Sequence, residues 1–264
     1  MTELHSWRVL NKGRSADVVL AADFNIAGRR EAGFADLVPR LDPGLAVWET
    51  DPPRVGDDFT LSGNDYVDRW ATAVRTTGRP VRAVLGFCAG SVFAAELAGR
   101  IEGWQGDPVP LILVDPEVPV ARTVQEQFHL AVDHMLTVLT PQERVATQEA
   151  ARRALAEDPD LAVFGPRLMK IFRESGQLAF DRVGLNPAGQ EEMFTTVSSF
   201  ISFVVAAAQL DPVPGWAKAT AVTSATEGSG TGAEHAARRL PFDVEHINLL
   251  RHEGVAAAIA GLLG

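Results

Sequence analysis

The sequence predicts an α/β protein, in which a mostly parallel sheet is covered by helices on both faces and interrupted by a helical insertion. Three observations support this class. Short apolar segments alternate with amphipathic ones between residues 17 and 117, which is the spacing of strand–helix units. The pattern is then almost entirely helical from about 120 to 210. A further strand pattern follows at 219–227.

The first two strands are expected at 17–22 ("DVVLAA") and 45–50 ("LAVWET"), because both segments are short and mostly apolar. The loop "DFNIAG" follows the first strand and leads to an expected helix near 31–41. Residues 62–76 have the spacing of an amphipathic helix, which Gly78 ends.

The third strand, "VRAVLG" at 81–86, runs into the pentapeptide GFCAG and then into an alanine-rich helix at 90–102. The fourth strand, "VPLILVDPE" at 109–117, stops at Asp115 and the proline after it. These strands and helices complete the alternating part of the expected sheet.

The chain between 120 and 210 contains no convincing strand, and "LAEDP" and "LNPAG" mark two helix-to-helix junctions. A helical block of this length between two strands of one sheet is typical of an inserted lid. The strand at 219–227, the turn "GSGTG" and a final helix at 251–263 come after it. We therefore expect a core made of residues 1–118 and 212–264 and a helical lid made of residues 119–211.

Acidic residues outnumber basic ones by 34 to 24, and the net charge of −10 argues against nucleic acid or an anionic membrane as a partner. The single cysteine cannot form an internal disulfide, which suits a reducing compartment. The N-terminal residues lack the positive-then-apolar order of a signal peptide, and no segment has about 18 uninterrupted apolar residues. We expect a soluble, cytoplasmic protein.

The chemistry is expected at the single cysteine. In GFCAG, glycines stand two positions before and two positions after Cys88, between an apolar strand and a helix. This is the pattern of the nucleophile elbow of α/β-hydrolases, in which serine usually holds the central position. Because an elbow places its nucleophile at a helix N-terminus, we expect the pKa of the Cys88 thiol to be lowered. The alternative is a small buried side chain without a chemical role.

Two residues can complete a catalytic triad in the chain order of this fold. Asp115 follows Cys88 by 27 positions and ends the next strand, so both should lie at the carboxyl edge of the sheet. Glu227, after the late strand, is the rival acid. His246 in "VEHINLL" precedes the last helix, where the general base of this fold arrives, and His252 is its one serious competitor.

The backbone N–H of Ala89 is expected to donate to the oxyanion of the reacting carbonyl. A second donor should come from the loop after the first strand, at Asn25 or Ile26. This chemistry needs neither a metal nor an organic cofactor.

Three features carry a resemblance to a known family, namely GFCAG, the early Asp115 and "EHINLL". The chain resembles the thioesterases that release acyl chains from carrier proteins in polyketide and non-ribosomal peptide assembly. This resemblance covers essentially the whole length of the chain. The cysteine makes it similar to the free-standing, cysteine-dependent Dieckmann cyclases, which release tetramates and pyridones. That resemblance implies a Cys88–Asp115–His246 triad on a thioesterase-like fold. The "DFNIAG" loop lacks the proline that is usual in thioesterases.

The resemblance also implies a substrate and a partner. The substrate is a β-ketoacyl-aminoacyl chain, held as a thioester on the phosphopantetheine arm of an acyl or peptidyl carrier protein. Transfer to Cys88 gives an enzyme thioester. After enolisation assisted by His246, the carbon between the ketone and the amide attacks that thioester and closes the ring of a tetramic acid or pyridone. The lid excludes water.

Two further sets of residues are expected to serve this reaction. The substrate pocket should include apolar side chains beside the elbow and on the lid, namely Phe87, Phe128, Phe172 and Phe203. An acidic carrier requires a local basic patch, because the protein itself is acidic. The two clusters that qualify are Arg29 with Arg30, and Arg167 with Lys170 and Arg173. Lid packing and solvated helix faces are the alternative explanations.

Three other functions fit parts of the pattern. A cysteine thioesterase would use the same triad to release the chain by hydrolysis, or by lactone or lactam formation. A dienelactone-hydrolase-like enzyme also has a cysteine elbow, but the early acid and the long insertion argue against it. A non-catalytic binding protein would keep the elbow without the reaction.

Overall fold

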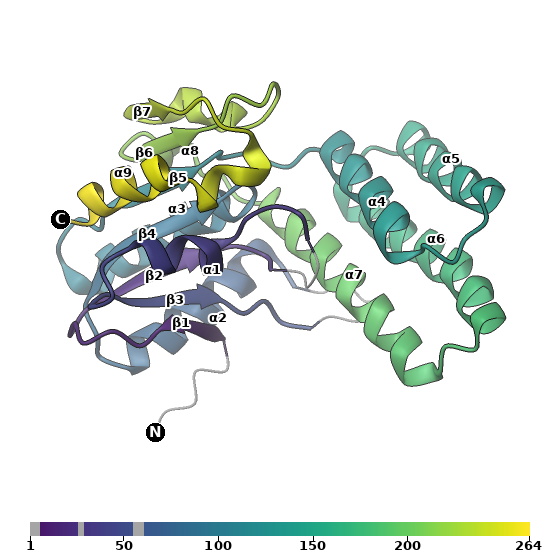
Figure 1. The fold of residues 1–264 in the computed structure, drawn as a ribbon, viewed down its shortest axis with the longest axis horizontal. Helices are drawn as coiled ribbons and strands as arrows, with labels where there is room; N and C mark the ends of the chain where they lie inside the picture. Colours follow the sequence, from purple (N-terminus) through teal and green to yellow (C-terminus); the bar gives the residue numbers. More distant parts are fainter. Residues whose placement is uncertain (1–5, 26–28, 55–60) are drawn as a thin grey trace. The chain divides into compact units, whose positions relative to one another are not determined.

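The computed structural model describes residues 6–25, 29–54 and 61–264, and the strands in this part form one seven-stranded sheet (Figure 1). The strand order is β1-β3-β2-β4-β5-β6-β7. β1 pairs antiparallel with β3, and all other pairings are parallel. The mostly parallel sheet predicted from the sequence is therefore confirmed. The strands are β1 (Trp7–Asn11), β2 (Val18–Ala22), β3 (Ala46–Thr50), β4 (Val81–Phe87), β5 (Leu111–Val114), β6 (Thr220–Thr223) and β7 (Arg238–Pro241).

Helical segments cover both faces of the sheet (Figure 1). On one face, residues of β2, β3, β4 and β5 form a continuous apolar core with α1 (Phe34–Leu37), η3 (His246–Arg251) and α9 (Glu253–Leu263). On the other face, α2 (Gly63–Thr76) and α3 (Gly90–Gln105) pack together through Tyr66, Trp70 and Phe93, whose ring centroids lie 5.3–5.6 Å apart. The remaining short helices are η1 (Val38–Arg40), α8 (Val213–Trp216) and η2 (Thr231–His235).

Two compact units make up the chain. The sheet unit holds the seven strands. The helical unit consists of Pro119–Ala208 together with the described residues of Pro53–Leu61. Phe128, Phe172 and Phe194 are buried in the core of the helical unit, with ring centroids 6.2 Å apart in each successive pair. The helices of this unit are α4 (Ala121–Met135), α5 (Pro141–Glu157), α6 (Leu161–Val183) and α7 (Pro187–Ala207). Within the described part of the chain, no helix is both long enough and apolar enough to span a membrane.

Several elements differ from the sequence prediction for local reasons. The helix expected near 31–41 is α-helical only to Leu37 and continues as the 3₁₀ turn η1, because Pro39 has no N–H to extend the α-helix. The strand expected over 109–117 ends at Val114, because Asp115 takes a left-handed conformation with φ of 42°. β1 and β7 were not predicted. Both are edge strands with exposed polar positions, so they lack the apolar runs of central strands.

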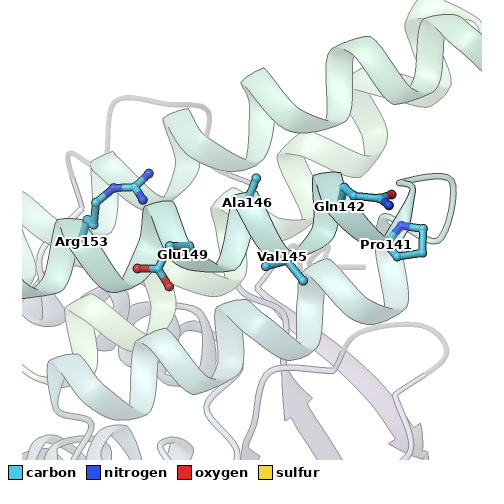
Figure 2. Close-up of a pocket in the computed structure, with 6 residues that line it drawn as sticks. All are labelled: Pro141, Gln142, Val145, Ala146, Glu149 and Arg153. Atoms are coloured by element: carbon cyan, nitrogen blue, oxygen red, sulfur yellow. The ribbon is translucent and has the colours of Figure 1, made fainter.

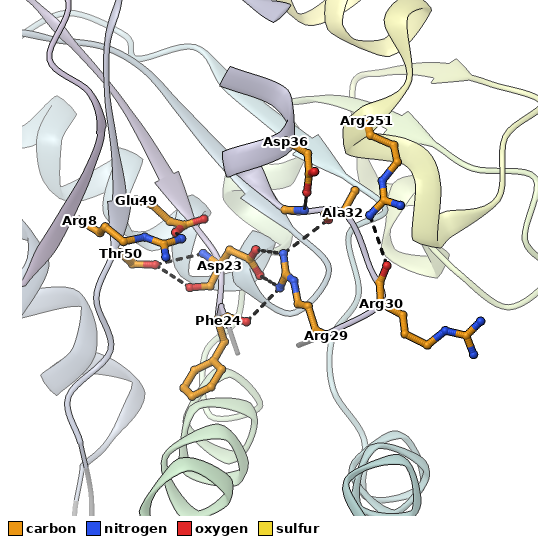
Figure 3. A network of polar contacts seen from close by, with 11 residues as sticks. Arg8, Asp23, Phe24, Arg29, Arg30, Ala32, Asp36, Glu49, Thr50 and Arg251 are labelled. Carbon is orange, nitrogen blue, oxygen red and sulfur yellow. Dashed lines mark hydrogen bonds and ion pairs between the residues drawn. The ribbon is translucent and has the colours of Figure 1, made fainter. Parts of the chain in front are cut away.

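A buried carboxylate lies on β3, the strand next to the edge strand β1. Glu49 of β3 is fully buried and forms an ion pair with Arg8 of β1 (Figure 3). Its Oε1 has no hydrogen-bond partner among the described atoms. Burial, together with the nearby charge of Asp23, raises the pKa of Glu49 to about 7, although Arg8 and Arg29 act in the opposite direction. The neutral form of Glu49 therefore suits the fold better than the charged form.

This raised pKa predicts a loss of stability as the pH increases. The folded state holds a proton on Glu49 that the unfolded state releases near the ordinary value of 4.5, so the free energy of unfolding should fall between about pH 4.5 and 7 and then level off. The shift sets an upper limit of roughly 3 kcal/mol for this fall. Glu49→Gln should remove most of it in denaturant titrations at pH 5, 6, 7 and 8. The exposed Glu227→Gln serves as the control, and parallel curves for Glu49→Gln and the wild type would contradict the assignment.

Candidate active site

Cys88 occupies a sharp corner between β4 and α3. It is one of two non-glycine residues with a positive φ in the described chain, at 48°, and a strained turn of this kind holds the nucleophile in elbow motifs. Glycine is required on both sides. A Cβ at Gly90 would lie 2.7 Å from the carbonyl carbon of Ala22 and closer still to its oxygen, and a Cβ at Gly86 would lie 2.5 Å from Cα of Ser91. The helix thus starts directly against the end of β2.

The Cys88 thiol is half-buried and donates a weak hydrogen bond to Oε2 of Glu117, with Sγ and Oε2 3.9 Å apart. Burial raises the pKa of this thiol, and the negative charge of Glu117 raises it further, whereas the backbone N–H of Ala89 lowers it. The sequence-based expectation of a lowered pKa is therefore wrong. One backbone donor at the helix start is outweighed by desolvation and by three neighbouring carboxylates, so the resting group is the thiol.

Asp115 and His246 meet at the carboxyl edge of the sheet. Asp115 follows β5 directly and is completely buried, and its Oδ2 accepts a hydrogen bond of 2.7 Å from Nδ1 of His246. Its Oδ1 accepts a second bond of 2.8 Å from the N–H of Ser224. With both oxygens engaged, the carboxylate has one orientation, and Nε2 is the ring nitrogen left for chemistry.

His246 is held from a second side by Phe87, the residue before Cys88. The two rings stack with centroids 5.0 Å apart and planes at 15°. The N–H of His246 also donates to Oγ1 of Thr226 over 2.8 Å. The structure thus brings Asp115 and His246 into direct contact and places Cys88 next to the residue that supports the imidazole. The hydrogen bond of the thiol goes to Glu117 rather than to His246 in the described part of the chain.

The rival residues lie elsewhere. Glu227 is exposed, and the acid that contacts His246 is Asp115. His252 packs its ring against Phe242, with centroids 6.3 Å apart. Asp115 and His246 are therefore in contact, and their roles as acid and base stay predictions.

The elbow and the loop after β2 hold the residues expected to donate to the oxyanion, and Arg29 follows them in the chain. The Ala89 N–H lies beside Sγ, Asn25 is exposed, and Ile26 lies outside the described residues. Arg29, expected on a docking surface, turns inward, where it bonds both oxygens of Asp23, at 3.0 and 2.5 Å, and stands 5.7 Å from the centre of the Phe87 ring (Figure 3). The charge of Arg29 is therefore paired with Asp23 within the fold.

The residues expected to act from the helical unit also have local partners. Phe128, Phe172 and Phe203 are buried in it, and the first two contact other aromatic rings, which is a packing role. The three cations each stand beside a glutamate, so their field is largely neutralised. The pairs are Arg167 with Glu157 at 2.5 Å, Lys170 with Glu174 at 3.9 Å and Arg173 with Glu191 at 3.2 Å.

A shallow depression lies along one face of α5, lined by residues from Pro141 to Arg153 (Figure 2). It contains one acidic and one basic side chain and no nucleophile. Among the residues that the structure describes, no cluster of His, Cys, Asp and Glu could hold a metal ion.

Sequence reasoning missed Glu117. The residue stands two positions after Asp115 in "VDPE", and the proline between them is a signal that both carboxylates belong to one rigid turn. Nothing in the linear pattern showed that this turn runs beside the elbow.

Comparison with solved structures identifies the fold. The thioesterase domain of NocB from the nocardicin cluster is 21% identical, with a TM-score of 0.55 over 98% of this chain and 99% of that one. The thioesterase domain of Vlm2 is 15% identical with a TM-score of 0.54 over 98% and 96%, and that of the surfactin thioesterase SrfTE is 16% identical with a TM-score of 0.52 over 99% and 96%. No protein-family model and no curated protein matches the sequence. The chain has the α/β-hydrolase fold in the form that these thioesterase domains share.

The close contact at the elbow predicts that Gly90→Ala is severely destabilising. The new methyl group must displace the backbone of β2, so we expect a loss of about 3 kcal/mol or more in the free energy of unfolding. Gly99→Ala in the same helix is the matched control. No atom lies within 4 Å of a Cβ there, and the change should stabilise the helix by about 0.5–1 kcal/mol. Equal stabilities of the two variants in denaturant titrations would contradict the packing described here.

Proposed function

We propose that this protein is a Dieckmann cyclase, which releases a β-ketoacyl-aminoacyl chain from a carrier protein through a Cys88 acyl-enzyme. The observation that carries the proposal is a thiol at the elbow of a thioesterase-like fold, with an Asp115–His246 pair beside it. Two structural neighbours support chain release by acyl transfer. The thioesterase domain SrfTE cyclises the lipopeptide surfactin, and the thioesterase domain of NocB forms a covalent complex with a fluorophosphonate analogue of nocardicin G.

Acylation requires the triad to act as a base. Because the raised pKa keeps Cys88 protonated at neutral pH, its thiol must lose the proton as it attacks the carrier thioester. His246 accepts this proton at Nε2 and returns it to the departing phosphopantetheine sulfur. Asp115 fixes the tautomer of the imidazole and stabilises the imidazolium. The N–H of Ala89 supplies one oxyanion donor.

Ring closure explains why the nucleophile is sulfur. A thioester is more electrophilic toward a carbanion than the ester that serine would form, and a thiolate is the better leaving group. The carbon between the ketone and the amide carries an acidic hydrogen, and its attack on the Cys88 thioester gives the five-membered 2,4-dione. The proposal assigns the exclusion of competing water to the helical insertion.

The proposed partner is an acyl or peptidyl carrier protein. Among the cations suggested by the sequence, Arg30 is exposed, and its side chain points away from the Arg29 network (Figure 3). Arg251, also exposed, donates to the backbone oxygen of Arg30 over 3.3 Å. These two cations form the basic site that we propose for the acidic carrier.

Product analysis tests the reaction type. The purified protein is incubated with an N-acetylcysteamine thioester of a β-ketoacyl amino acid, and the product masses are read. Loss of the thiol without gain of water supports cyclisation. A product that has gained water would show hydrolysis and overturn the proposal.

Substitutions at Cys88 test the nucleophile. Cys88→Ala should lower turnover by on the order of 10³-fold or more, because no acyl-enzyme can form. Cys88→Ser should lose cyclisation and keep at most slow hydrolysis, since its ester is a poor electrophile for carbon. Circular dichroism confirms folding of both variants. Near-normal turnover of Cys88→Ala would eliminate the covalent mechanism.

A further inference from the structure

Glu117 is in contact with the thiol of the proposed nucleophile, and the fold holds it there. Its Oε2 is 3.9 Å from Sγ of Cys88, and its backbone N–H donates to the carbonyl oxygen of Cys88 over 3.4 Å. The proline before it is also anchored, because the N–H of Gly232 donates to the oxygen of Pro116 over 2.9 Å. One short turn thus carries two carboxylates. That of Asp115 contacts His246, and that of Glu117 contacts Cys88.

We propose that Glu117 is the catalytic base for carbon in the cyclisation step, which leaves His246 as the base for acylation. This inference rests on the proposed function. In the acyl-enzyme, the thioester carbonyl carbon is bonded to Sγ, and the attacking carbon approaches it to about 3–3.5 Å. Glu117, in contact with Sγ, stands beside this position and is within reach of the proton that must leave.

The proton that Glu117 removes returns to Sγ at the end of the cycle, so the enzyme regains the thiol seen in the structure. Glu117 removes the proton from the carbon between the ketone and the amide, and the resulting enolate attacks the thioester carbonyl to form the C–C bond. The C–S bond breaks, and its electron pair remains on Sγ. The carboxyl group of Glu117, now neutral, gives its proton to Sγ, which restores the thiol donating to the carboxylate. Ring closure and regeneration of the enzyme use the same proton.

This cycle also removes an electrostatic obstacle. Burial raises the pKa of the Cys88 thiol, and the anionic Glu117 in contact with Sγ raises it further by disfavouring a second negative charge there. Expulsion of a thiolate would be slow beside that charge. Once Glu117 carries the carbon proton, its charge is gone and the sulfur becomes a good leaving group. Proton removal and thiolate departure are thereby coupled.

Glu117→Gln separates the two halves of the reaction. Acylation of Cys88, followed by intact-protein mass spectrometry, should proceed at a rate close to that of the wild type. Ring closure should slow by about 10²–10⁴-fold, so the acyl-enzyme accumulates. In steady-state kinetics kcat and KM should fall together while kcat/KM, which reports acylation, stays nearly constant. Glu117→Asp should restore part of kcat, and the exposed Glu227→Gln serves as the control.

Alkylation of the free enzyme gives an independent readout. Removing the negative charge lowers the pKa of the thiol, so iodoacetamide should modify Cys88 faster in Glu117→Gln than in the wild type at pH 8. Faster alkylation with slower cyclisation supports the inference. Wild-type turnover of Glu117→Gln, or an equal loss of acylation and cyclisation, would overturn it. Hydrolysed product from the wild-type enzyme would instead overturn the proposed function, whereas the outcomes for Glu117→Gln bear only on the role of Glu117.

Discussion

The hydrogen bond of 2.7 Å between Nδ1 of His246 and the buried Asp115 is the interaction on which the site depends. It joins residues 131 positions apart and ties the segment after the helical insertion to the edge of the sheet formed before it. Loss of the imidazole would leave Oδ2 of the buried Asp115 without its described partner, and an unsatisfied buried acceptor costs about 1–3 kcal/mol. The same contact therefore fixes the orientation of the imidazole and stabilises the fold.

The elbow and the turn after β5 share an unusual backbone conformation. Both Cys88 and Asp115 take left-handed backbone conformations, so each strand turns sharply at the residue that follows it. Phe87 then links the two by stacking on His246, with Arg29 near the same ring. The Cys88 thiol is protonated at rest. It follows Phe87, which stacks on the imidazole of His246, and it contacts the carboxylate of Glu117. Such a thiol resists oxidation at rest, because reactivity toward oxidants follows the thiolate.

The sheet, the sharp turn at Cys88 and the proximity of Asp115 to His246 could be predicted from the sequence, because each has a local or topological signal. GFCAG marks the turn, and parallel strands bring Asp115 to the edge where Cys88 emerges. Other features depend on three-dimensional burial. The pKa of Cys88 is raised by burial and by Glu117, whose loop packs beside the elbow, and this contact has no signal in the sequence. The sequence likewise does not show that Arg29 pairs with Asp23 instead of lying on the surface. The edge strands β1 and β7 are short and partly exposed, so neither has the buried apolar run by which a central strand is recognised.

The proton on Nδ1 of His246 offers the most direct test of the central claim, that Asp115 is the acid that orients the base. A proton in a short bond between imidazole and carboxylate resonates far downfield of the backbone amides, and the proton NMR spectrum in water should show it in the wild-type protein. The signal should vanish in Asp115→Ala and in His246→Ala and persist in Glu227→Ala. A signal that survives Asp115→Ala, or that disappears in Glu227→Ala, would contradict the account.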